Sequence, residues 1–444
     1  MIKIFKYSKL ILLSYILRKK YNYYNKLSNK DYNILKNNIN DCGCICIKCI
    51  QWLIPILEQQ NVDEDLINVL NNLYYNCYTH DLKYTKDKYK ELFYNDIDNE
   101  YEICNIIGSG SIAQVYKIKD KNGKYYAMKV KHPNIQKDIY LFKNIFNLLY
   151  KLSCFNNICY KYFPFNLITF LNDFYKQCDF MNESNNLIEF HKYYKDNNNI
   201  IIPELYKVSN DIIIMEYIEG TMFDDSDISE YEKSKIIFLL YLFVRNNLII
   251  HNHIHGDLHK YNWKIINNKE NNLYKLVIYD FGYCFKLNDE EFKYMCIISK
   301  LITSFDKNDK NMIKEYNEFL KYIYNDDNVI NSITFNHNMT KPDILLKNIL
   351  NISYKYNIFI KINKILNTLL LMCLLEKNFE KYNINNNEEP KKIRKNLLDT
   401  YTFCDTYKIF PKLADHLLKE YKGTKHSESL FETIEFNDKI KSLI

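Results

Sequence analysis

The segment HGDLHKYN, residues 255–262, carries the most specific pattern in this chain. Asp257 and Asn262 stand in the spacing D-x-x-x-x-N, which phosphoryl-transfer enzymes use in a catalytic loop. In such a loop the carboxylate orients an attacking hydroxyl group and accepts its proton, and the amide turns back to ligate Mg²⁺. We therefore expect Asp257 to be catalytic and Asn262 to bind metal.

A second motif, VIYDFG, follows at residues 277–282. Its apolar residues predict a short buried strand, and Asp280 comes directly after that strand. A carboxylate oxygen suits a hard cation that bridges the phosphates of a nucleotide. We predict Asp280 as the second Mg²⁺ ligand of the same site.

Towards the N-terminus, the segment GSGSIAQV at 108–115 joins two runs of β character, 102–107 and 112–118. A glycine-rich turn lets backbone N–H groups approach nucleotide phosphates, because no side chain obstructs them, although alone such a loop is most often only a tight turn. Residues 212–215 form another short apolar strand. The predicted ATP contacts are Gly108, Ser109, Gly110, Ser111, Ala113 and Val115 in the loop, with Met215 and Glu216 at the end of that later strand.

A hairpin signal, Asn122-Gly123, precedes a return strand over 125–130 that contains Lys129. This is the strand on which the kinase-type fold places the lysine that holds the α- and β-phosphates. A lysine among apolar neighbours needs a charged partner. Glu183, within a predicted helix, is the candidate partner, so Lys129 and Glu183 join the catalytic group.

Glycine usage supports these assignments. The chain has only 8 glycines in 444 residues, where average usage of about 7% would give roughly 30. Four of them, Gly108, Gly110, Gly256 and Gly282, fall in the motifs above, and Gly123 makes the hairpin. A glycine retained under such compositional pressure indicates a position at which a Cβ is not tolerated.

Composition excludes several classes of protein. Aromatic residues make up 16% of the chain, which is too many for a disordered protein, and a net charge of +6 does not favour nucleic acid as a partner. No segment reaches the roughly 20 apolar residues of a spanning helix. The 13 cysteines form no regular disulfide framework, so we expect an intracellular, reducing compartment. Cys42, Cys44, Cys46 and Cys49 are interpreted as small apolar residues of a helix rather than as a metal site.

Two further features leave alternatives open. Residues 1–30 contain eight lysines and arginines and no acidic residue, around a short apolar stretch. This pattern fits an organelle-targeting presequence, a membrane-surface helix or an ordinary first helix of a lysine-rich protein. The histidines at 251–259 invite a zinc site, but the metallo-hydrolase pattern H-x-H-x-D-H is broken by Leu258, and zinc is disfavoured.

Taken together, the motifs resemble the UbiB family of atypical kinases, also called AarF-domain kinases. The similarity rests on residues 109–116 and 127–133, on the catalytic loop and on Asp280-Phe281-Gly282, and it covers about 40–380. The K-x-G-Q motif of the family is matched by Lys48 and Gln51, with Ile50 in place of the glycine. Three further positions depart from the family pattern: Gln177 replaces the first acid of E-x-D, and Lys260 and Tyr261 replace Pro and Gly of the catalytic loop.

The resemblance implies an α+β, bilobal protein-kinase-like fold with a small β-rich N-lobe, a helical C-lobe and a helical N-terminal extension. It also implies Mg-ATP as cofactor, an isoprenoid lipid of the ubiquinone type or a membrane surface as partner, and an extension that covers the peptide site. Protein partners stay open. The expected regions are 1–30 (basic apolar segment), 31–100 (extension), 101–220 (N-lobe with helical insert), 221–382 (C-lobe) and 383–444 (helical tail).

Two other functions remain compatible with the residues. The segment 255–262 fits a small-molecule phosphotransferase of the aminoglycoside or choline kinase type equally well. A nucleotide-dependent lipid-binding pseudokinase anchored by residues 1–30 also fits, because retained ATP and Mg²⁺ ligands do not require turnover. Lys48, Gln51 and the SIAQV segment favour the UbiB-like interpretation, an ATP-dependent phosphotransferase or ATPase.

Overall fold

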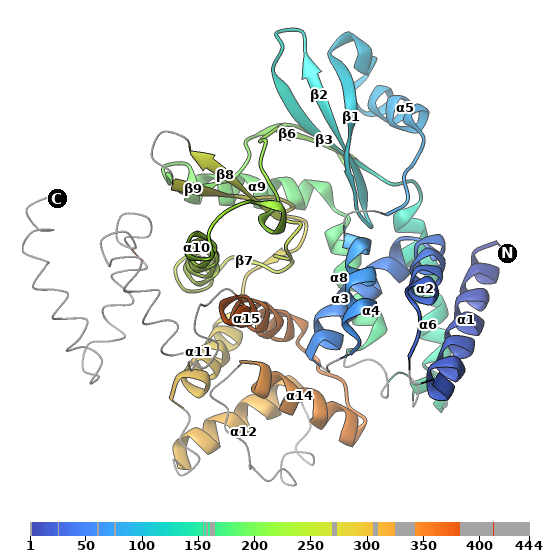
Figure 1. Cartoon of the computed structure of the whole chain (residues 1–444), viewed down its shortest axis with the longest axis vertical. Coiled ribbons are helices and arrows are strands. Elements are labelled where there is room, and N and C mark those ends of the chain that lie inside the picture. The colour runs from blue at the N-terminus through green and yellow to red at the C-terminus, as the bar shows by residue number, and fades with distance from the viewer. Residues whose placement is uncertain are drawn as a thin grey trace, which may run out of the picture.

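The structure is a computed structural model of the chain (Figure 1). It describes residues 2–381 apart from 25, 60–61, 75–76, 154, 157–158, 160–164, 269–272, 305–309 and 325–341, together with residue 412. The predicted tail, 383–444, therefore lies outside the described residues except for Lys412. Two lobes are present, a small lobe around an antiparallel sheet and a larger lobe of helices, so the predicted α+β bilobal fold is confirmed.

The small lobe is a five-stranded sheet in the order β1-β2-β3-β6-β5. Its two faces follow from strict alternation of side chains. Tyr116, Met128 and Ile214 lie on one face and pack against Tyr89 of helix α5 and Ile97. The strands are β1 (Tyr101–Ser109), β2 (Ala113–Asp120), β3 (Tyr125–Lys131), β5 (Leu205–Val208) and β6 (Ile212–Glu216).

The β2–β3 hairpin forms where Asn122-Gly123 predicts it. Gly123 has φ +86°, a left-handed conformation that L side chains rarely adopt. The carboxylate of Asp120 accepts the backbone N–H groups of Asn122 and Lys124 at 2.9 and 2.8 Å, which closes the turn. The hairpin fixes the register of the strand that carries Lys129.

The N-terminal extension is a helical layer beside both lobes (Figure 1). Helix α2 begins at a capping box in which Ser28 and Asp31 each bond to the backbone N–H of the other. Gly43, at φ +89°, separates α2 from α3. The helices are α1 (Ile2–Tyr24), α2 (Asn29–Cys42), α3 (Cys44–Gln59), α4 (Glu64–Asn71), η1 (Asn72–Tyr74), α5 (Leu82–Phe93) and η2 (Ile97–Asn99).

Within the described residues, three helices lie between β3 and β4: α6 (Ile135–Leu149), α8 (Leu167–Gln177) and α9 (Phe180–Tyr194). Helix α9 begins at an aspartate cap, since the carboxylate of Asp179 accepts the N–H groups of Met181 and Asn182. Asp179 is the acid of the E-x-D pattern that the chain retains, so its role here is to start the helix that carries Glu183.

The large lobe is built around α10, whose apolar residues belong to the main core. Strand β4 lies within the range 101–220 expected for the N-lobe, but it pairs in parallel with β9 in a separate three-stranded sheet, β4-β9-β8. No helix within the described ranges is long and apolar enough to cross a bilayer. The elements are β4 (Ile200–Ile201), η3 (Phe223–Asp225), α10 (Glu230–Ile249), β7 (Ile254–His255), β8 (Trp263–Asn268), β9 (Leu273–Ile278), β10 (Cys284–Phe285), α11 (Asp289–Ser304), α12 (Lys310–Tyr324), α14 (Pro342–Tyr356) and α15 (Asn363–Lys381).

Candidate active site

The register of the N-lobe sheet brings the predicted nucleotide residues into one row. Gly108 on β1 pairs with Val115 on β2, and Val115 pairs with Lys129 on β3. Because side chains alternate along a strand, Ala127 lies on the same face as Lys129, and Met215 is its cross-strand partner on β6. This face is opposite to the one covered by α5, and it looks towards the large lobe.

Lys129 joins the two lobes through two ion pairs. Its Nζ lies 2.7 Å from Oε1 of Glu183 on α9 and 3.0 Å from Oδ1 of Asp280. The lysine and glutamate side chains are buried, whereas 44% of the Asp280 side chain is exposed. The predicted Lys129–Glu183 pair is therefore present in the geometry, and the metal candidate Asp280 shares the same ammonium group.

The pKa values of Lys129, Glu183 and Asp280 are shifted in different directions from their ordinary values. Burial, together with the nearby charge of Asp280, raises the pKa of Glu183 to about 7, against the attraction of Lys129. Oε2 of this buried carboxylate has no hydrogen-bond partner among the described residues. Burial also acts to raise the pKa of Asp280, but the Lys129 ammonium outweighs it and holds that pKa well below its usual range. Asp280 and Glu183 in turn raise the pKa of Lys129 against its burial. At neutral pH Lys129 and Asp280 are charged.

Asp280 sits at a special point of the backbone. It follows β9 and has φ +56°, a conformation uncommon for a residue with a side chain. The N–H of Gly282 donates to Asp280 Oδ1 at 3.3 Å, and Nδ2 of Asn186 on α9 donates to the carbonyl of Phe281 at 3.0 Å. Backbone strain at such a site is maintained by surrounding contacts, and here α9 supplies one of them.

Asn262 stabilises the turn of the catalytic loop, residues 255–262, through hydrogen bonds within the loop. Asn262 Nδ2 donates to the carbonyl of Asp257 at 2.7 Å, and the N–H of Asn262 donates to the carbonyl of His259 at 2.9 Å. His255 Nε2 lies 3.1 Å from the carbonyl oxygen of Tyr279, which ties the loop to the segment that carries Asp280. The motifs at 255–262 and 277–282 therefore form one site.

The donor set fits a magnesium ion. Oδ2 of Asp280 and Oδ1 of Asn262 form no hydrogen bond or ion pair with any residue that the structure describes. Carboxylate and amide oxygens are suitable donors for this hard cation, which keeps several waters and uses few protein ligands. Within the described residues, no group of three or more His, Cys, Asp or Glu side chains is arranged to hold a metal ion.

The N-terminal extension contacts the catalytic loop through an ion pair between Lys48 and Asp257. Lys48 Nζ, on α3, donates to Asp257 Oδ2 at 2.7 Å, and the lysine side chain is only 5% exposed. Burial acts to raise the pKa of Asp257, but Lys48, with His259, lowers it below its usual value. The carboxylate predicted to receive an acceptor hydroxyl therefore already holds a buried ammonium group.

Gln51, the second residue of the extension motif, does not contact the catalytic loop directly. Its Nε2 donates to the carbonyl of Leu73 at 2.6 Å, and the hydroxyl of Tyr74 donates to the carbonyl of Gln51 at 2.8 Å. The ring of Tyr74 lies 4.2 Å from that of His259, centroid to centroid. Gln51 thus positions a tyrosine that covers the catalytic loop, a role that sequence reasoning missed.

The glycine-rich loop is tied to the extension as well. The carbonyl of Ser109 accepts the N–H of Cys77 at 2.9 Å, and the Ser109 hydroxyl donates to the carbonyl of Tyr78 at 2.7 Å. The N–H of Gly110 donates to the carbonyl of Ala113 at 2.9 Å. Ser109, Ser111 and Ala113 are buried. The loop is therefore an ordered turn held by residues 77–78.

Met215 and Glu216 lie at the end of β6, where Glu216 pairs with Tyr126 of β3. The N–H of Glu216 donates to the carbonyl of Glu204 at 2.8 Å. Met215 pairs with Ala127, so both residues lie on the strand next to β3, which carries Lys129. The assignment of Met215 and Glu216 to the nucleotide remains a prediction.

Comparison with known proteins identifies the family of the chain. Residues 83–317 match the family model of the ABC1 atypical kinase-like domain. The chain is similar to the probable serine/threonine-protein kinase abkC of Dictyostelium discoideum, with 27% identity over 39% of this chain and 25% of that protein. It is also similar to AarF domain-containing protein kinase 1 of Xenopus laevis, with 24% identity over 48% of this chain and 41% of that protein.

These alignments span less than half of the length of either relative. Among solved structures, the chain resembles that of the Rv3197–erythromycin complex from Mycobacterium tuberculosis, with 16% identity and a TM-score of 0.41 over 69% of this chain and 84% of that one.

Proposed function

The chain belongs to the ABC1 atypical kinase-like family, and from that premise we propose that it binds Mg-ATP and transfers the terminal phosphoryl group to an acceptor hydroxyl or to water. One observation carries the proposal: Lys129 is held between Glu183 and Asp280, at 2.7 and 3.0 Å, beside the loop of Asp257 and Asn262. In this arrangement Lys129 is available to the nucleotide phosphates, Asp280 and Asn262 offer oxygens to a metal ion, and Asp257 is the proton acceptor.

Each side chain has a defined task under this proposal. Lys129 neutralises phosphate charge, and Glu183 keeps its ammonium group in place. Asp280 and Asn262 would hold Mg²⁺, which when bound neutralises the charge on the phosphates. Asp257 orients the attacking hydroxyl and accepts its proton. Gly108 and Gly110 leave room for phosphates along the backbone, since a Cβ built at Gly108 meets no atom within 4 Å.

Lys48 competes with the acceptor in this scheme. A hydroxyl that bonds to Asp257 Oδ2 must first displace the Lys48 ammonium from its 2.7 Å contact. Rates of transfer therefore depend on how often α3 withdraws Lys48. At Lys129 the bound carboxylates are Glu183 and Asp280, which belong to the nucleotide site itself. We therefore expect no group of the extension to compete with ATP at this lysine.

We place the activity in isoprenoid-lipid metabolism of the ubiquinone type, at a membrane surface within the cell. The support is the similarity to the UbiB family and the character of α1. Its side chains Phe5, Leu12 and Ile16 are 72%, 59% and 51% exposed. Lysines flank them, and no acidic residue occurs among the first thirty. An exposed apolar row with basic flanks suits an anionic bilayer surface.

A nucleotide-turnover assay tests the proposal, with and without isoprenoid headgroup analogues and vesicles. Asp257→Asn keeps the size of the side chain and can still accept a hydrogen bond from Lys48, but it cannot take a proton at neutral pH. Loss of a general base costs about 10² to 10⁴ in rate, so turnover should fall by at least the lower figure while ATP binding persists. Turnover unchanged in Asp257→Asn would assign the activity to another site. ATP binding without turnover by the wild type, with every acceptor tried, would favour a nucleotide-dependent binding protein.

A further inference from the structure

Lys264 is a partly buried lysine on β8, two residues after the metal candidate Asn262. Side chains alternate between the two faces of a strand, and the next residue, Ile265, belongs to the main core of the large lobe. Lys264 therefore lies on the opposite face of this sheet. Its cross-strand partner on β9 is Val277, three residues before Asp280. The face that carries Lys264 thus continues from the two residues expected to hold the metal ion.

The linker 217–221, which follows β6 of the small lobe, passes beside this lysine. The N–H of Thr221 donates to the carbonyl of Ile265 at 2.9 Å, and the N–H of Ile265 donates to the carbonyl of Thr221 at 3.0 Å. These bonds fix the linker along the edge of β8. A Cβ built at Gly220 would lie 3.1 Å from Cβ of Lys264. The stem of Lys264 is therefore packed directly against the linker backbone.

The ammonium group of Lys264 has no bonded partner within the part of the chain that the structure describes. It forms no hydrogen bond or ion pair there, and its Nζ lies 6.0 Å from the centre of the Tyr279 ring. The charge of Glu219 acts on it without an ion pair. The hydroxyl of Tyr279 donates to the carbonyl of Ile218 at 3.0 Å and so belongs to the linker contact. A partly buried cation without a partner suits an acceptor atom of a ligand.

The expected position of the phosphates places Lys264 at the base end of a nucleotide. Lys129 and Asp280 lie at the phosphate end, 3.0 Å apart. The other ATP contacts predicted from the sequence, Met215 and Glu216, stand at the end of β6, immediately before the linker. A nucleotide that spans these two groups has its base beside the linker, where Lys264 also lies.

The chemistry of an ammonium group selects among purine bases. Lysine has three donors and no acceptor. Guanine presents two neighbouring acceptors, O6 and N7, whereas adenine presents N7 beside the N6 amino group, which donates. A lysine at the edge of the ring therefore favours guanine. Adenine can still use N7, so selection of this kind is a preference and does not exclude ATP.

We infer that Lys264 binds the base of the nucleotide and that the site takes guanine nucleotides, with Mg-GTP bound more tightly than Mg-ATP. The inference rests on the proposed function, because the same groups hold the triphosphate of either nucleotide, and it adds the selection of the base. In this arrangement Nζ of Lys264 donates to O6 and N7 of guanine.

Equilibrium binding of Mg²⁺-nucleotides to the full-length protein tests the inference. The wild type should bind GTP at least about fivefold more tightly than ATP. ITP retains O6 and N7 and lacks only the amino group of guanine, so it should keep most of this preference, whereas 7-deaza-GTP should lose part of it. Lys264→Met should abolish the preference for GTP over ATP. Lys264→Arg should retain it, because a guanidinium also donates to O6 and N7.

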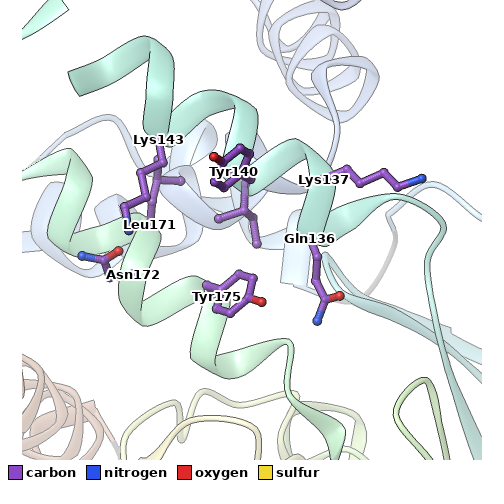
Figure 2. Close-up of a pocket in the computed structure, with 8 residues that line it drawn as sticks. Gln136, Lys137, Tyr140, Lys143, Leu171, Asn172 and Tyr175 are labelled. Atoms are coloured by element: carbon purple, nitrogen blue, oxygen red, sulfur yellow. The ribbon is translucent and has the colours of Figure 1, made fainter. Parts of the chain in front are cut away.

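A matched control is available in a groove away from the nucleotide site. This groove, of about 440 Å³ between α6 and α8, is lined by Lys137 and Lys143 at its opposite ends (Figure 2). Lys143 is partly buried, as Lys264 is. Lys143→Met therefore removes the same charge from a comparable position and should keep the ratio of the two dissociation constants. The melting temperature of each variant without nucleotide reports on its folding.

The possible results separate the base contact from the proposed function. ATP binding by the wild type without a preference for GTP would overturn the base contact and leave the proposed function in place. A preference that survives in Lys264→Met would do the same. An equal loss of ATP and GTP affinity in Lys264→Met would assign the lysine to the ribose or the phosphates and would also overturn the inference. Failure of the wild type to bind either nucleotide would contradict the proposed function itself.

Discussion

Lys48 Nζ lies 2.7 Å from Asp257 Oδ2, although the two residues are 209 positions apart. The contact joins α3 of the extension to the catalytic loop, and the lysine side chain is 5% exposed while that of Asp257 is 25% exposed. An ammonium group with so little access to water depends on its partner more than the carboxylate does. Lys48 therefore restrains Asp257 and is itself fixed by it.

Removing this lysine should release the catalytic carboxylate. A hydrogen bond between charged groups contributes about 2 kcal/mol, so Lys48→Met should lower the free energy of unfolding by about that amount. If the same contact excludes the acceptor, turnover should rise, up to about 30-fold, because the competent fraction increases. Initial rates at saturating Mg-ATP measure the effect.

The matched control is Lys20→Met, which breaks a 2.7 Å ion pair with Asp31 elsewhere in the extension. It should leave turnover unchanged. An equal effect of the two variants, or no rise with Lys48→Met, would show that Lys48 does not limit access to Asp257.

Two glycines of the motifs should respond differently to alanine. A Cβ at Gly256 would lie 2.6 Å from Phe285 Cε1 and 2.8 Å from Tyr283 Cδ1, so the rings must move. Crowding of this kind costs about 1–3 kcal/mol. A Cβ at Gly108 meets nothing within 4 Å, so Gly108→Ala should change stability by less than about 0.5 kcal/mol and weaken ATP binding instead. Urea denaturation and ATP titration of both variants measure the contrast, and equal destabilisation would contradict it.

A buried pair of histidines lies behind the glycine-rich loop. His80 Nδ1 and His132 Nδ1 are 2.8 Å apart, and His132 Nε2 lies 3.1 Å from the carbonyl oxygen of Gly110. That carbonyl only accepts, so Nε2 of His132 carries a proton, and in the neutral ring its Nδ1 accepts from His80. The other nitrogen of His80 lies 2.9 Å from Thr85 Oγ1, a hydroxyl that can donate or accept. One proton lies between the two Nδ1 atoms, so the contact requires at least one of the two rings to be neutral.

This pair predicts a loss of stability in acid. Burial lowers the pKa of both His80 and His132 to about 4, below the unfolded value of about 6.5. A depressed pKa means that the unfolded chain binds protons first, so the contribution is complete above pH 6.5 and is lost as the pH falls towards 4. Allowing for partial exposure, we expect a loss on the order of 2 kcal/mol.

Chemical denaturation across this range gives the measurement. His132→Gln keeps a side chain that can donate to the Gly110 carbonyl and removes one titrating ring. Its stability should depend less on pH than that of the wild type between pH 6.5 and 4. An identical pH profile for the two proteins would refute a role for the histidine pair.

Helix α1 should account for most of the vesicle binding. Leu12→Gln with Ile16→Gln replaces two exposed side chains, so the melting temperature should not change. Burying one such side chain contributes about 1.5–3 kcal/mol, so affinity for anionic vesicles should fall at least tenfold, and added salt should weaken the remaining electrostatic part. Ile106→Gln with Ile188→Gln, at positions 47% and 50% exposed, is the control. Unchanged vesicle binding would leave α1 as an ordinary surface helix.

Local sequence patterns predicted the features that depend on neighbouring residues. The hairpin at Gly123, the strand of Lys129 and the two motifs around Asp257 and Asp280 each have a turn or an apolar run that fixes them. The ion pair between Lys129 and Glu183 was also predictable from the sequence, because a buried lysine requires a carboxylate partner. These inferences needed no knowledge of distant packing.

Other features had no local signal. Strand β4 pairs with β9, more than seventy positions away, and a two-residue apolar segment cannot specify its partner. Placement of Lys48 on Asp257, and the role of Gln51 in holding Tyr74, arise from how the extension packs on the large lobe. Lysine is common throughout this chain, so only the similarity to a family singled out Lys48.

Binding of Mg-ATP is the central claim, and thermal unfolding with ATP in the presence of Mg²⁺ or a chelator tests it most directly. At about 100 times its dissociation constant, a ligand stabilises the fold by about 2.7 kcal/mol. The wild type should melt several degrees higher with Mg-ATP than without nucleotide, and Asp280→Asn should lose most of the Mg²⁺-dependent part of that shift. Absence of any nucleotide shift in the wild type at every Mg²⁺ concentration, or an undiminished shift in Asp280→Asn, would contradict the account.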